Sequence, residues 1–219
     1  MTLFDISIPL SATTPPWPGD TPFSCGWTCR RESGDSVNLG TITTSAHIGT
    51  HADAPVHVES AWAGSESLPP SVFVGEALVL ALPVEHRADQ DVSAGLLQSL
   101  VHAHIGGRTI TRLLLRTGHS IAGGVFPEDW PVLSVEATQW LLIRGVRLFG
   151  VDAPSVDRRT SQALPVHHAL FAGGGYNIEN LALDGVREGV YELLAQPVAV
   201  HGADAAPVRA LLRGYGAEI

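Results

Sequence analysis

The chain has 219 residues, 45% of them hydrophobic, which is enough for one core, and we expect a single domain over 1–219. Its formal net charge of −9 argues against nucleic-acid binding, because contacts to phosphates need a basic surface. All 13 basic residues are arginines, and the absence of lysine excludes a lysine Schiff base and a P-loop lysine.

The first residues, Met1–Asp5, lack the basic and apolar regions of a signal peptide, and no apolar run reaches the length of a membrane span. We therefore expect a cytoplasmic protein that does not interact with membranes. Cys25 and Cys29 are the only cysteines. On a strand they would lie about 13 Å apart, which is too far for a disulfide.

The chain opens with a short alternating strand over 3–8, followed by the proline-locked loop Pro15-Pro16-Trp17-Pro18-Gly19-Asp20. The prolines keep Trp17 out of regular structure, so we expect its indole either to plug the core or to form one wall of an apolar pocket. Two strands follow over 23–31 and 36–44, joined by a turn at 33–35. A break in their alternation at Gly40 predicts a bulge.

Directly after this hairpin, three histidines and an aspartate fall within eleven residues, His47-Ile48-Gly49-Thr50-His51-Ala52-Asp53-Ala54-Pro55-Val56-His57. Imidazole nitrogen and carboxylate oxygen are preferred ligands of zinc and related divalent ions. The spacing of His47 and His51 would place both rings on one side of a helical turn, and Gly49 and Pro55 favour a tight turn or short helix within a loop. Asp53 and His57 can then converge on the same point after the bend at Pro55. The segment predicts a metal site, and the alternative is a polar surface loop that contains histidines.

Strands and helices alternate through the second half. The patterns predict a buried strand over 75–82, a helix over 91–104, a strand over 109–116, a helix over 134–144 capped by Ser134, and a strand over 146–151. This alternation indicates an α/β fold in which helices cover a mixed β-sheet.

One segment of this half resembles the elbow of serine hydrolases. The strand over 109–116 leads into Gly118-His119-Ser120-Ile121-Ala122, whereas the elbow has the pattern G-x-S-x-G followed at once by a helix. Ala122 stands where the motif needs glycine, and Gly123-Gly124 is a poor helix start. The metal site is therefore favoured over a serine nucleophile.

A second polar cluster lies at His167-His168 and Glu179. Pro165 begins a helix that ends at the glycines 173–175, and the two histidines point to different environments, so only one of them is a candidate ligand. Glu179 lies in an apolar, strand-like run over 176–181, where a carboxylate needs a compensating cation. That cation is either a metal ion or an arginine.

The pattern His47-x-Gly49-Thr50-His51-x-Asp53-x-Pro55-x-His57 closely resembles the signature of the metal-dependent cyclase-like hydrolases, and within them the bacterial kynurenine formamidases. Ile48 departs from the threonine or other small residue that relatives often carry, but it does not stand at a ligand position. The resemblance covers nearly the whole chain through the segments 16–20, 152–155, 167–168, 179–181 and 206–210.

The resemblance implies a swivelling β/β/α domain, usually a homodimer, that binds two divalent ions, zinc in the first place and manganese as an alternative. It assigns the first ion to His47, His51 and Asp53, with Asp53 bridging to the second. His167, preferred over His168, and Glu179 complete the second ion's ligands, His57 acts as proton donor and acceptor, and Trp17 contacts the substrate.

The implied reaction is hydrolysis of N-formyl-L-kynurenine, a small aromatic substrate, to L-kynurenine and formate in tryptophan degradation. Two alternatives stay open. A related metal hydrolase would act on another amide, lactam or ester such as isatin, and a non-catalytic protein would bind metal without hydrolysing anything.

Overall fold

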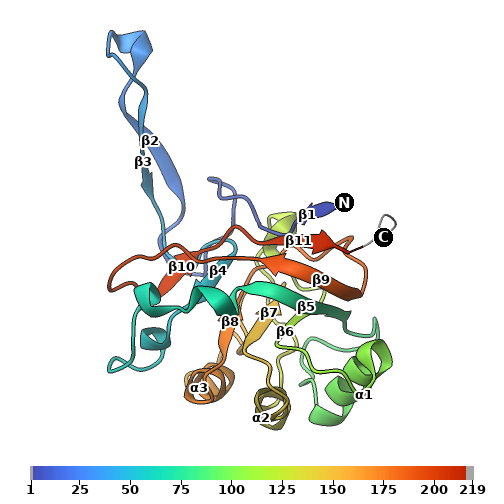
Figure 1. Cartoon of the computed structure of the whole chain (residues 1–219). Coiled ribbons are helices and arrows are strands. Elements are labelled where there is room, and N and C mark those ends of the chain that lie inside the picture. Colours follow the sequence, from blue (N-terminus) through green and yellow to red (C-terminus); the bar gives the residue numbers. More distant parts are fainter. Residues whose placement is uncertain (1, 216–219) are drawn as a thin grey trace.

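The computed structural model describes residues 2–215 and contains a seven-stranded mixed sheet with three α-helices against one face (Figure 1). The strand order is β1 (Leu3–Asp5), β11 (Leu211–Gly214), β9 (Gly189–Leu194), β5 (Val74–Ala81), β6 (Arg112–Arg116), β7 (Leu148–Val151) and β8 (Tyr176–Ile178). The predicted α/β class, a mixed sheet with covering helices, is confirmed.

The strands β5, β6, β7 and β8 are parallel, and each connection between them carries one α-helix. Ser93 and Ser134 cap the first two helices, because their side chains accept hydrogen bonds from the backbone N–H groups of Leu96 and Ala137. Pro165 begins the third. The helices are α1 (Ala94–Ile105), α2 (Val135–Ile143) and α3 (Pro165–Ala172), close to the predicted bounds.

Side chains of β5 alternate between two hydrophobic clusters, one on each face of the sheet. Leu78 and Leu80 pack toward the helices, whereas Ala77 and Val79 join the cluster on the opposite face. The continuous apolar run predicted as a buried strand is therefore buried on both sides.

The antiparallel edge of the sheet was not predicted. β9 pairs with β5, and β11 lies between β9 and β1. The first strand ends at Asp5 rather than at residue 8, because Ser7 bridges to Leu181 and the chain leaves the sheet there. These short strands are held by pairing partners far away in the chain, which local patterns do not reveal.

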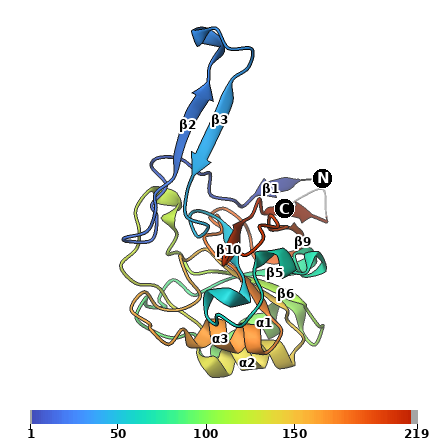
Figure 2. The ribbon, with the colours of Figure 1, turned by 90° about the vertical axis from the view of Figure 1, so that its left-hand side faces the viewer.

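The predicted hairpin stands away from the body of the protein as a two-stranded arm, β2 (Ser24–Cys29) and β3 (Leu39–Thr43) (Figure 2). The bulge falls in β2 between Trp27 and Cys29, opposite Gly40, so its placement in the second strand was wrong. Both cysteines are free, as expected.

The histidine-rich segment forms the short strand β4 (His51–Asp53), which pairs with β10 (Ala205–Pro207). The remaining helical segments are single 3-10 turns: η1 (Arg31–Ser33), η2 (Pro55–His57), η3 (Ser65–Ser67), η4 (Pro70–Val72) and η5 (Ile121–Gly123). Among residues 2–215, none of the helices combines the length and the apolar character needed to cross a membrane.

Candidate metal centre

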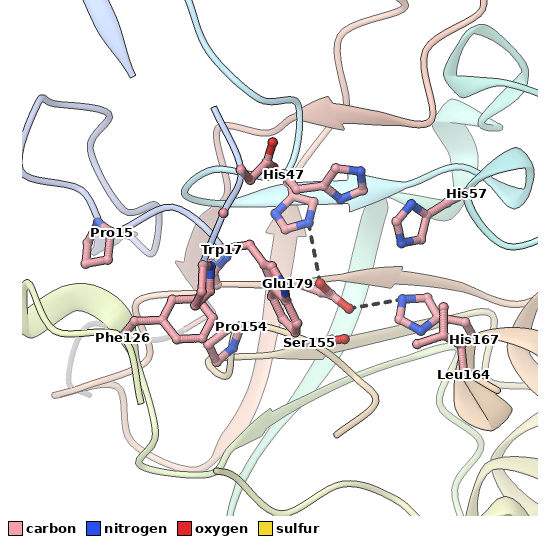
Figure 3. Close-up of a pocket in the computed structure, with 15 residues that line it drawn as sticks. Pro15, Trp17, His47, His57, Phe126, Pro154, Ser155, Leu164, His167 and Glu179 are labelled. Carbon is pink, nitrogen blue, oxygen red and sulfur yellow. Dashed lines mark ion pairs between the residues drawn. The ribbon is translucent and has the colours of Figure 1, made fainter. Parts of the chain in front are cut away.

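Backbone pairing brings the two predicted clusters together. The N–H of Glu179 donates to the carbonyl of His51 at 2.9 Å, and the N–H of His51 points back to the carbonyl of Glu179 at 3.4 Å. Helix α3 adds His167 from the other side, 3.3 Å from Glu179 Oε1 (Figure 3). The segment at His51 therefore meets two segments that lie more than 100 residues further along the chain.

Of the two forms predicted for this segment, the tight turn is present and the short helix is not, because the chain turns sharply at residues 47–50 and enters a strand at His51. Gly49 makes this turn possible with φ of +64°, and a Cβ there would lie 2.5 Å from Leu10 Cδ2. The rings of His47 and His51 still approach each other, with centroids 5.0 Å apart.

The first group of candidate ligands is His47, His51 and Asp53. Asp53 Oδ1 lies 3.0 Å from His47 Nδ1 and 3.3 Å from His51 Nε2. His51 and Asp53 are almost fully buried, whereas His47 is partly exposed.

The second group is Asp53, His167 and Glu179, all buried. His167 Nε2 lies 3.0 Å from Asp53 Oδ2 and 3.3 Å from Glu179 Oε1. Asp53 therefore turns one carboxylate oxygen to each group, as the resemblance implies for a bridging ligand.

Hydrogen bonds on the far ring nitrogens orient two of the histidines. His51 Nδ1 lies 2.9 Å from the carbonyl oxygen of Gly49, and His167 Nδ1 lies 2.7 Å from Asp157 Oδ2. An acceptor at Nδ1 fixes the proton there and leaves the lone pair of Nε2 toward the carboxylates, as ligand histidines require. Sequence reasoning missed Asp157, whose only local signal is a carboxylate near the start of α3.

Unpaired buried atoms show that the site suits a cation. His51 Nε2 and Asp53 Oδ1 are buried and make no hydrogen bond. Such atoms are costly in a protein interior unless they are ligated. Oxygen and imidazole donors in two adjoining groups fit divalent ions of the zinc class.

The carboxylates also control protonation of the imidazoles. Burial lowers the pKa of His51, but Asp53 and Glu179 outweigh it and raise that pKa to about 9. Burial likewise lowers the pKa of His47, but hydrogen bonds to Asp204 and Asp53 outweigh burial and raise that pKa to about 10. Protons on the histidines therefore balance the carboxylates in the ion-free protein, and a bound cation would displace them.

These groups lie in a cavity of about 480 Å³. Trp17 and Phe126 form one side of it, opposite His57 and His167 (Figure 3). The Trp17 ring packs edge-on against Phe126 at 5.4 Å and against the buried Trp130 at 6.0 Å. Trp17 therefore meets both expectations, since it covers the core and lines the pocket.

His57 lies at the rim of the cavity, where sequence reasoning missed Asp204. Asp204 Oδ2 lies 3.0 Å from His47 Nε2 and 3.5 Å from His57 Nδ1. Pairing of β10 with β4 places Asp204 there, and the N–H of Ala54 donates to its carbonyl. The hydrogen bond from His47 lowers the pKa of the Asp204 carboxyl more than burial raises it. The pKa of Asp204 therefore lies below its ordinary value.

Other candidates lie outside this cluster. His168 is half-buried beside the Trp62 ring at 6.0 Å. Ser120 caps the 3-10 turn η5 rather than an α-helix, so the strand–turn–helix of a serine-hydrolase elbow is not formed. Glu179 contacts His51 and His167 within salt-bridge distance, so the alternative of an arginine partner was wrong.

The sheet, its covering helices and the two ligand groups that share Asp53 define an α/β protein with a candidate metal centre. The family model named Cyclase matches residues 4–158. A kynurenine formamidase of Salinibacter ruber is 43% identical over 222 residues, covering 97% of this chain and 98% of the relative. The chain belongs to the cyclase family.

Solved structures agree with this assignment. One is described as a potential metal-dependent hydrolase with cyclase activity, with 26% identity, a TM-score of 0.78 and 96% coverage of both chains. Isatin hydrolase A from Ralstonia solanacearum has 25% identity and a TM-score of 0.81, covering 96% of this chain and 91% of its own. Both share the fold over nearly their full length.

Proposed function

We propose that this protein hydrolyses N-formyl-L-kynurenine to L-kynurenine and formate, as a kynurenine formamidase of tryptophan degradation. The observation that carries the proposal is the pair of ligand groups sharing Asp53 beside a cavity that Trp17 and Phe126 line. The relative at 43% identity bears the formamidase name, whereas the isatin hydrolase is 25% identical.

The proposed cofactors are two divalent ions, zinc first and manganese as the alternative. His47, His51 and Asp53 would hold one, and Asp53, His167 and Glu179 the other. A divalent ion in such a site ionises water near neutral pH and polarises a carbonyl oxygen.

We assign proton transfer to His57. It lines the cavity without belonging to either of the two ligand groups that share Asp53, and its Nδ1 faces the Asp204 carboxylate. A base there accepts a proton as water oxygen bonds to the formyl carbon. When the carbon–nitrogen bond breaks, the same imidazole returns the proton to the arylamine nitrogen, so each turnover leaves His57 unchanged.

The aromatic wall of the cavity, formed by Trp17 and Phe126, would bind the aromatic ring of the substrate. Trp17 and Phe126 offer rigid apolar surface, which binds a planar ring at little cost in side-chain entropy. A ring held against this wall places its formamide toward the buried carboxylates on the other side of the cavity.

We further propose that the protein is a cytoplasmic homodimer, with the β2–β3 arm at the subunit interface. The arm stands away from the body (Figure 2) and exposes large apolar side chains that a partner would cover. They are Trp27, Val37, Leu39 and Ile42. Light scattering on the purified chain tests the dimer, and replacing Leu39 and Ile42 by serine should shift it to monomers.

The deciding experiment combines metal analysis of the purified protein with an assay of formate release from N-formyl-L-kynurenine. We expect about two ions per chain, and activity that a chelator abolishes and zinc restores. Faster turnover of isatin than of the formamide would favour the sibling hydrolase. Bound metal without hydrolysis of either compound would favour the non-catalytic alternative.

A further inference from the structure

Asn177 in β8 lies against the second ligand group. Its Nδ2 donates to Asp53 Oδ2 at 2.6 Å and to Glu179 Oε1 at 3.0 Å, and lies 3.5 Å from His167 Nε2. These three atoms are the ones through which Asp53, Glu179 and His167 face one another. One carboxamide therefore joins the two carboxylates of this group.

The opposite end of the side chain makes this arrangement informative. Asn177 is fully buried, and its Oδ1 has no hydrogen-bond partner. A buried amide with an unpaired oxygen is costly in free energy. The neighbouring position in the strand shows the usual solution, because Ile178 is equally buried and apolar. No hydrogen bond at Oδ1 offsets the free-energy cost of burying this amide. The benefit of an asparagine at this position therefore lies in the hydrogen bonds that Nδ2 donates.

We infer that Asn177 is a positioning residue for the second ion, an inference that depends on the two-ion centre proposed above. Two buried carboxylates repel each other, and an amide that donates a hydrogen bond to both offsets part of this repulsion. The carboxamide holds Asp53 and Glu179 together, with His167 fixed separately by Asp157. Hydrogen bonds to ligand carboxylates of this kind support metal affinity.

The inference distinguishes the two ion positions. Asp53 faces the first group through Oδ1, which Asn177 does not contact, and the second through Oδ2, which it does. Loss of the carboxamide should therefore weaken the second ion far more than the first. The alternative is that the N–H groups compete with the ion for the same oxygens, and it predicts the opposite change.

The test is a metal titration of the full-length chain and of the variant Asn177→Leu, which keeps the number and branching of the side-chain heavy atoms and removes both hydrogen bonds. The protein is stripped with a chelator and titrated with zinc against a chromophoric competitor. A parallel Co²⁺ titration, followed by visible absorption, reports each site separately. We expect the first equivalent to bind within about threefold of wild type and the second to bind about 10–100-fold more weakly.

Two further variants make the result decisive. Asn177→Ser is smaller and can donate to only one carboxylate at a time, so it should show a partial loss and decides the question if the leucine variant does not fold. Thr138→Val removes an equally buried hydroxyl that bonds within α2, and it should bind both equivalents as wild type does.

Wild-type affinity, or tighter binding, of the second equivalent in Asn177→Leu would overturn the inference and leave the two-ion centre standing. Uptake of a single equivalent by the wild-type chain would instead overturn the two-ion centre, and the inference with it. Because binding is measured without substrate, neither outcome depends on catalytic activity.

Discussion

The two ligand groups that share Asp53 are built in different ways. The first takes all its members from one segment of seven residues, 47–53, and His47 reaches the rim. The second takes one residue each from β4, α3 and the end of β8, and all three are buried. The first position is therefore set by a local turn, and the second by the packing of the whole sheet edge.

This difference suggests that the two ligand groups have different roles. The buried group is backed by Asp157 and Asn177, so its geometry is fixed before an ion enters. The partly exposed group opens toward His57 and the cavity, where a substrate arrives.

The shared ligand gives the largest effect. Asp53→Ala should remove both ions and lower kcat by about 10⁴-fold or more, because each position loses a carboxylate. Metal content and formate release measure this directly. Asp184→Ala, an exposed carboxylate on the loop after β8, is the matched control and should retain both. Retention of two ions by Asp53→Ala would show that the groups do not share this residue.

His57 should matter for turnover but not for metal binding. His57→Ala is expected to lower kcat by about 10²–10⁴-fold while the ion content stays unchanged. His102→Ala, an exposed histidine on α1, should behave as wild type. If His57→Ala turned over normally, another group would have to carry the proton.

The buried group can be loosened alone through Asp157. Asp157→Asn keeps the shape of the side chain but removes the charge that holds His167 Nδ1, so the second ion should bind about 10–100-fold more weakly. A zinc titration measures this, with the first equivalent as internal control. Equal weakening of both equivalents would contradict the separation of the groups.

The aromatic wall should affect substrate binding more than chemistry. Trp17→Ala is expected to raise KM for N-formyl-L-kynurenine about tenfold, because it removes apolar contact area from the cavity. Trp17→Phe should recover most of the loss. Steady-state kinetics on metal-loaded protein distinguishes this from a folding defect, which would lower the active fraction and leave KM unchanged.

The smallest effect is on stability without metal. In the folded ion-free chain, His51 and His47 have pKa values raised to about 9 and about 10 from 6.5. Their contribution to stability is complete below pH 6.5 and is lost as the pH rises through these values. The Tm of chelator-treated protein should therefore fall by several degrees between pH 7 and 10. Zinc-loaded protein should show a smaller change, and an equal fall in both would contradict this account.

The same contrast explains what the sequence could predict. His47, His51 and Asp53 stand within one segment, so their common site was visible from spacing, and the local structure is a tight turn followed by a short strand. Glu179 was visible because a charge in an apolar run needs a partner, whereas His167 was preferred over His168 through the family resemblance. Asp204 and Asn177 were not, because their roles arise from pairing and packing between distant segments. Asp157 was not, because its contact depends on how the loop before α3 folds back onto His167.

The most direct test of the central claim is a crystal structure of the zinc-loaded protein with anomalous scattering measured at the zinc edge. The account predicts two anomalous peaks, one on each side of the Asp53 carboxylate. The first should contact His47 and His51, and the second His167 and Glu179. A single peak, or a second peak away from Glu179, would contradict it.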